Sequence, residues 1–62
     1  MDYAMKIKEY RLKKFLSQTD LAILLHVSTV TVNRWETGKY EPTLKIKKKL
    51  HDLFLEVGIE EN

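Results

Sequence analysis

The segment 16–38 most restricts what this chain can fold into, because it encodes two short helices separated by only three residues. Ser17, with Asp20 three positions later, forms a capping-box pattern that predicts a helix over about residues 18–25. A second helix is predicted over about residues 29–36, directly after another serine suited to cap it. The segment therefore predicts two helices that meet at a tight turn, with the second held at a fixed angle by the first.

The two helices of this segment differ in how much they offer to a core. The first has Leu21, Ala22 and Leu25 inward, and Ala22 is small enough for a crossing helix to come close. The second has only Val32 and Trp35 inward. Its outward positions, mostly polar or basic, are Thr29, Val30, Asn33 and Arg34. A short helix with such a face suits insertion into the major groove of double-stranded DNA.

Apolar side chains also recur with helical spacing in the rest of the chain. A helix is predicted over about residues 3–14, where Tyr3, Ile7, Tyr10 and Lys14 recur at helical spacing. Another, over about residues 44–57, carries the stripe Ile46, Leu50, Leu53 and Val57, broadened by Phe54. Gly38 and Gly58 are suited to end the helices that precede them. No segment has the pattern of a strand, so we predict an all-α fold, a compact four- to five-helix bundle, with residues 1–62 as a single domain.

The composition limits the chemistry open to the chain. With 62 residues it can hold one small domain, and without cysteine it has no disulfide or thiolate metal site. His26 and His51 lack partners at metal-ligand spacing, and the serines lack the histidine and acid of a nucleophilic triad. We therefore expect no enzyme activity, no metal and no cofactor. The lack of a signal peptide or a membrane-spanning apolar run favours the cytoplasm, and the initial Met and acidic end favour a complete chain.

Charge is divided unevenly along the chain. Residues 1–49 contain all eleven Lys and Arg with five acidic residues, a net of +6. Residues 50–62 contain four acidic residues and no Lys or Arg, a net of −4. A basic body with an acidic tail over about residues 56–62 suits a polyanionic partner that contacts one side of the protein. The alternative is a Lys-rich soluble surface that has no such partner.

Four lysines crowd the first turns of the helix predicted over residues 44–57, Lys45, Lys47, Lys48 and Lys49. Cations at this end of a helix oppose its dipole, by about 0.3–1 kcal/mol each when exposed. A phosphate docked at the helix start would remove the conflict, because backbone N–H groups and lysines would then both face an anion. Lys45 is therefore predicted to contact phosphate, and a solvated lysine face is the alternative.

The central segment also resembles a known family. The run Gln18-Thr-Asp-Leu-Ala22, then Val27-Ser28, Val32 and Trp35-Glu36-Thr-Gly38-Lys39 through Pro42, is similar to the helix-turn-helix of lambdoid phage repressors and Cro proteins, the XRE family. The resemblance covers about residues 7–54, with the motif itself at about 18–37. His26 and Phe15 stand where the family usually has Gly. The resemblance implies a lambda repressor-like DNA-binding domain and a repressor-like regulator from a bacterium, phage or mobile element, associated with the nucleoid.

The resemblance also implies roles for individual residues. Helix 29–36 would read base edges through Thr29, Val30, Asn33 and Arg34. Contacts to the DNA backbone are expected from residues around the motif, namely Gln18, Ser28, Thr31, Thr37, Lys39 and Tyr40. Gln18 would also support the second helix of the motif. Arg11 and Glu36 would form an internal salt bridge.

The small size of the domain predicts a symmetric dimer. One copy can contact only a few base pairs, so we expect a homodimer on a palindromic operator in double-stranded DNA. The predicted interface is the end of the last helix and the tail, with Leu55, Val57 and Ile59 as its apolar part. Acidic residues at the same end should keep association weak in free protein. Two alternatives remain, a DNA-targeting or antitoxin module of a larger system, and a helical protein-interaction module that does not bind DNA.

Overall fold

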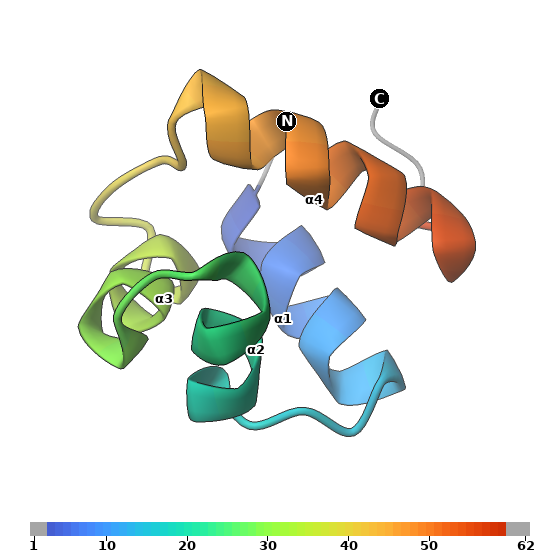
Figure 1. The fold of residues 1–62 in the computed structure, drawn as a ribbon, viewed down its shortest axis with the longest axis horizontal. Helices are drawn as coiled ribbons and strands as arrows, with labels where there is room; N and C mark the ends of the chain where they lie inside the picture. The colour runs from blue at the N-terminus through green and yellow to red at the C-terminus, as the bar shows by residue number, and fades with distance from the viewer. Residues whose placement is uncertain (1–2, 60–62) are drawn as a thin grey trace.

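The computed structural model describes residues 3–59, which form four α-helices and no strand (Figure 1). The helices are α1 (Tyr3–Lys13), α2 (Gln18–Leu25), α3 (Thr29–Glu36) and α4 (Leu44–Glu56). The predicted all-α fold is confirmed, and α2 and α3 begin and end at the predicted residues. Residues 1–2 and 60–62 lie outside the described part, and with them the end of the predicted acidic tail.

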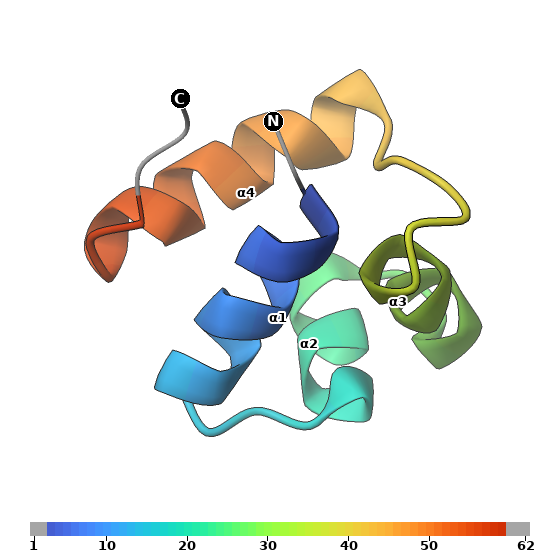
Figure 2. The ribbon, with the colours of Figure 1, turned by 180° about the vertical axis from the view of Figure 1, so that it is seen from behind.

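The four helices pack in an arrangement that leaves α3 at the periphery. α3 packs against both α1 and α2, and α4 packs against α1. Figure 1 shows α4 crossing above the other three helices, with the loop from α3 to α4 running along one side. Figure 2 shows the opposite side, where α1 lies in front, below α4 and beside α2. One side of α3 is therefore packed on the domain and the other is open to solvent.

The core takes side chains from every helix. Its buried members are Ile7, Tyr10, Leu21, Ala22, Leu25, Val32, Trp35, Leu50, Phe54 and Ile59. The rings of Tyr10 and Phe54 join α1 to α4, with centroids 6.1 Å apart and planes tilted by 55°. The inward positions predicted for α2 and α3 are all buried. The predicted α4 stripe also faces the core, although Ile46, Leu53 and Val57 are only half-buried.

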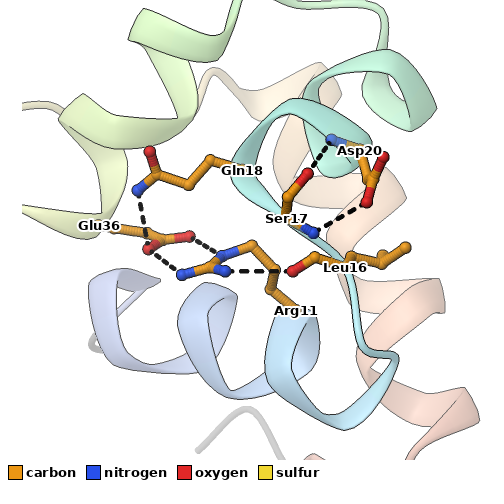
Figure 3. Close-up of polar contacts among 6 residues, drawn as sticks. All are labelled: Arg11, Leu16, Ser17, Gln18, Asp20 and Glu36. Carbon is orange, nitrogen blue, oxygen red and sulfur yellow. Dashed lines mark hydrogen bonds and ion pairs between the residues drawn. The ribbon is translucent and has the colours of Figure 1, made fainter.

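Serine side chains fix the start of α2 and the start of α3. The Ser17 Oγ accepts a hydrogen bond from the Asp20 N–H at 3.0 Å, and the Asp20 carboxylate accepts one from the Ser17 N–H at 3.0 Å (Figure 3). These two bonds form the predicted capping box, and the hydrogen bonds from Ser17 lower the pKa of Asp20 below its ordinary value. At α3, the Ser28 Oγ accepts from the Thr31 N–H at 3.1 Å. Both helix starts are thus defined by local hydrogen bonds that the sequence specifies.

Two turns place non-glycine residues in the left-handed backbone region. Phe15, after α1, has φ 56°, and His26, after α2, has φ 59°. Phe15 turns the chain away from α1, so its side chain is 94% exposed and Lys14 is also exposed. The helix predicted over about residues 3–14 ends one residue earlier, at Lys13, because the chain reverses at Phe15. At His26, the reversal lets the Val27 N–H bond the Ala22 carbonyl at 2.9 Å.

We expect His26→Gly to stabilise the protein by roughly 0.5–1 kcal/mol. A left-handed backbone costs a non-glycine residue about 1–2 kcal/mol, and glycine avoids this cost. Glycine also raises the conformational entropy of the unfolded chain, which offsets part of the gain. The matched control is Lys48→Gly, at an exposed position within α4, which should lower the free energy of unfolding by roughly 1 kcal/mol instead. Thermal unfolding followed by circular dichroism measures both variants. A loss of stability in His26→Gly like that of the control would contradict the strain argument.

Candidate nucleic-acid interface

α3 is anchored by two buried side chains and exposes the residues predicted to read bases. Val32 is fully buried and Trp35 is 4% exposed, so both belong to the core. The outward face consists of the exposed residues Thr29, Val30, Asn33 and Arg34. Val30 is 59% exposed, although an apolar side chain on a solvated helix face gains nothing for folding. The structure thus brings the four predicted base-reading residues together on one accessible helix face.

Hydroxyl groups link the beginnings of the two helices of the motif. The Thr29 Oγ1 donates to the Thr19 Oγ1 at 3.3 Å, which joins α3 to α2. The Ser28 and Thr31 hydroxyl oxygens lie 2.8 Å apart in a further hydrogen bond. The sequence analysis did not predict this role of Thr19, although its position as the second residue of α2 could have indicated it. Together these contacts restrain the α3 start at the edge where backbone-contacting residues are predicted.

The end of α3 is tied to α1 by the predicted ion pair. The Arg11 Nε donates to Glu36 Oε2 at 2.8 Å and the Arg11 Nη2 to Glu36 Oε1 at 3.0 Å (Figure 3). The side chains are 14% and 4% exposed. The hydrogen bond to Glu36 raises the pKa of the Arg11 guanidinium. This bidentate geometry is the strong form of an arginine–carboxylate contact, and it fixes α3 against α1.

Two further hydrogen bonds complete this cluster. The Arg11 Nη1 donates to the Leu16 carbonyl at 3.1 Å, in the turn between α1 and α2. The Gln18 Nε2 donates to Glu36 Oε1 at 3.2 Å, from the first residue of α2 (Figure 3). Arg11, Gln18 and Glu36 therefore connect three helices, and Gln18 supports α3 as predicted. The predicted contact of Gln18 with phosphate stays a prediction.

The loop after α3 folds back on Arg34. Gly38 has φ 79°, and its N–H bonds the Trp35 carbonyl at 3.1 Å, while the Lys39 N–H bonds the Arg34 carbonyl at 3.1 Å. These two bonds are those of a Schellman motif, which requires the left-handed residue that glycine supplies. The Thr37 Oγ1 also donates to the Arg34 carbonyl, at 3.2 Å. The Arg34 Cζ then lies 5.2 Å from the centre of the Tyr40 ring, a contact that sequence reasoning missed.

The lysines at the start of α4 are mostly available to a partner. Lys45, Lys48 and Lys49 are exposed, whereas Lys47 pairs with Glu41 at 3.2 Å and lies 5.1 Å from the centre of the Tyr3 ring. Thr43 has the backbone conformation of an N-cap, but its side chain makes no cap hydrogen bond. The α4 start thus combines exposed cations with a helix end that its own N-cap side chain leaves uncapped.

The residues predicted for a dimer interface are not equally accessible. Leu55 is 59% exposed on α4, and Val57 is half-buried. Ile59 is 3% exposed and packs in the core, so its predicted place on an apolar interface is wrong. Gly58, with φ 76°, turns the chain back after α4, and the Ile59 N–H bonds the Phe54 carbonyl at 2.9 Å. Leu55 and Val57 remain as the accessible apolar part of this end.

Residues 3–59 contain no cluster of three or more His, Cys, Asp or Glu side chains that could hold a metal ion. None of α1 to α4 combines the length and the apolar character that crossing a membrane requires.

Comparison with known proteins agrees with this geometry. The family model described as helix-turn-helix matches residues 7–61. A relative from Methanocaldococcus jannaschii, named as an uncharacterized HTH-type transcriptional regulator, is 45% identical over 49 residues, which are 79% of this chain and 74% of the relative. No solved structure matched the chain. With its motif at α2 and α3 and a family match over most of its length, the chain belongs to the helix-turn-helix family.

Proposed function

We propose that this protein is a sequence-specific regulator of transcription, repressor-like in action, that reads the major groove of double-stranded DNA with α3. The observation that carries the proposal is that α3 has one side packed in the core and the other side exposed. Two of its residues hold it in the core, its end is locked by the Arg11–Glu36 pair, and its outward, mostly polar face is exposed to solvent. The relative's name, an HTH-type transcriptional regulator, supports the same role. A regulator of this kind would work on the chromosome, at the nucleoid in the cytoplasm.

The outward face of α3 has the donors and apolar groups that base edges require. The guanidinium of Arg34 can bond guanine O6 and N7 as a fork, and the amide of Asn33 can pair with adenine N6 and N7. The methyl groups of Val30 and Thr29 can contact the thymine methyl. Each good bidentate contact discriminates between bases by about 1–3 kcal/mol. Specificity on this proposal comes from these four side chains.

Affinity on this proposal comes from residues around the motif. Backbone phosphates would be contacted by Gln18, Ser28, Thr31, Thr37, Lys39, Tyr40 and Lys45. Lys39 and Lys45 are exposed, and Lys45 lies at the α4 start, where helix N–H groups favour an anion. Such contacts position the protein without reading sequence, because every nucleotide carries the same phosphate.

Selection of bound duplexes from a random pool tests this proposal. We expect a defined sequence with two-fold symmetry, since a domain with one short reading helix covers only part of a unique site. Affinity for the selected duplex should fall steeply as salt rises, because each neutralised phosphate releases counterions. A pool without any enriched sequence, or binding that does not respond to salt, would refute DNA reading and favour a protein-interaction module.

We expect Leu55→Asp to weaken binding to a symmetric operator about tenfold, the effect of losing roughly 1.4 kcal/mol of apolar contact between two copies. The reason is that Leu55 is an exposed apolar residue at the α4 end, where Val57 is also partly accessible. Leu12→Asp is a matched control, since Leu12 is 58% exposed on α1 and should not affect dimerisation. Sedimentation of the protein alone and with the duplex gives the stoichiometry. One chain per duplex, unaffected by Leu55→Asp, would rule out this dimer.

A further inference from the structure

The contact between Arg34 and Tyr40 joins a residue predicted to read bases to a residue predicted to contact the DNA backbone. Arg34 belongs to the outward face of α3, and Tyr40 belongs to the loop that leads to α4. The Arg34 Cζ lies over the Tyr40 ring, 5.2 Å from its centre. This distance is within the range of a cation–π interaction, in which the ring attracts the guanidinium.

The conformation of the loop after α3 positions the Tyr40 ring, and hydrogen bonds to the Arg34 carbonyl hold that conformation. The Arg34 carbonyl accepts hydrogen bonds from the Lys39 N–H at 3.1 Å and from the Thr37 hydroxyl at 3.2 Å. Gly38, in the left-handed region at φ 79°, supplies the reversal between them. Tyr40 follows Lys39 directly, so the same turn that ends α3 brings the Tyr40 ring back to the Arg34 side chain in the last turn of that helix.

Among residues 3–59, the Tyr40 ring is the one partner that the structure gives to the Arg34 guanidinium. No ion pair or hydrogen bond of that guanidinium occurs within the described part. An arginine side chain with no such contact would spread over many rotamers on an exposed helix face, and binding would have to order it. A ring partner holds the cation through its face and leaves the N–H groups at its edge free to donate.

We infer that Tyr40 is a positioning residue for Arg34, which holds the guanidinium ready for one base pair and so sharpens the choice of base there. This inference rests on the proposed function and adds to it. The phenol oxygen and the ring then have separate roles. The hydroxyl is the part of Tyr40 expected to reach a phosphate, which all sequences share, whereas the ring acts on selectivity through Arg34.

Binding of five proteins to a set of duplexes tests the inference: the wild type, Tyr40→Leu, Tyr40→Phe, Arg34→Ala and the double variant Arg34→Ala with Tyr40→Leu. The set is the selected operator and its variants at the base position where Arg34→Ala loses its preference. Tyr40→Leu should reduce discrimination at that position about two- to five-fold, the size expected for one exposed cation–π contact. Tyr40→Phe should keep the wild-type discrimination even if its affinity for all duplexes falls. In an Arg34→Ala background, Tyr40→Leu should leave discrimination unchanged.

Two further outcomes separate this inference from the proposed function. If the wild-type protein selects a sequence and Tyr40→Leu lowers affinity for every duplex equally, Tyr40 is a backbone contact only and the inference is overturned. If the wild-type protein enriches no sequence, the proposed function fails and the inference fails with it. The free protein provides an independent readout, because the ring current of Tyr40 should shift the NMR signals of the Arg34 side chain. That shift should persist in Tyr40→Phe and disappear in Tyr40→Leu, and its absence from the wild-type protein would overturn the positioning role.

Discussion

Glu36→Gln is expected to lower the free energy of unfolding by about 3 kcal/mol, at the low end of the 3–5 kcal/mol typical when one partner of a buried ion pair is removed. The physical reason is that Arg11 would keep its charge while only 14% exposed, without the carboxylate that receives its two donors. For a domain of this size the loss corresponds to a fall in Tm of roughly 12–24 °C. Thermal unfolding followed by circular dichroism measures it directly.

A matched control exists within the same chain. Glu41 pairs with Lys47 at a similar distance, 3.2 Å, but its side chain is 73% exposed. Glu41→Gln should therefore cost less than about 1 kcal/mol, as exposed pairs do. Replacing both buried partners, Arg11→Met with Glu36→Leu, should cost less than Glu36→Gln alone, since no charge is left unpaired. Equal losses in Glu36→Gln and Glu41→Gln would mean that the Arg11–Glu36 pair is not buried in solution.

Arg34→Ala is expected to abolish the preference for one base in the selected operator, with a loss of discrimination of about 1–3 kcal/mol, or roughly 5- to 150-fold. The guanidinium is exposed on the outward face of α3 and can donate to guanine as a fork. Lys39→Ala is the control, because loss of a backbone contact should weaken all duplexes about equally and reduce the salt dependence. Repeating the selection with each variant distinguishes the two effects. An unchanged sequence preference in Arg34→Ala would show that α3 is docked in some other way.

The parts of the fold that the sequence predicted well are those governed by local interactions. α2 and α3 have the predicted bounds because each begins at a serine whose side chain bonds its own helix start. The Arg11–Glu36 pair, which joins residues distant in sequence, was accessible only through the family resemblance. Periodicity alone cannot say which charged residues on two different helices will meet.

The predictions that failed concern the chain just beyond a helix. Lys14 fits the helical spacing of α1, but the helix ends one residue earlier and Phe15 reverses the chain. Ile59 lies beyond Gly58, where helical spacing no longer applies, and the turn there buries it. The Arg34–Tyr40 contact has the same origin, since it depends on how a loop returns and not on any repeat. Left-handed turns therefore set the limit of what helical periodicity could predict in this chain.

The way α3 is held has a consequence for how such proteins diverge. Val32 and Trp35 are the two core residues of α3, while Thr29, Val30, Asn33 and Arg34 contribute little to the core. Substitutions at these four positions should usually change stability by less than about 0.5 kcal/mol. On the proposed role of this face in reading bases, a duplicated gene could acquire a new operator through a few mutations there while the scaffold stays folded. On that proposal, stability and target choice are separated within a single eight-residue helix, so selection can act on one without loss of the other.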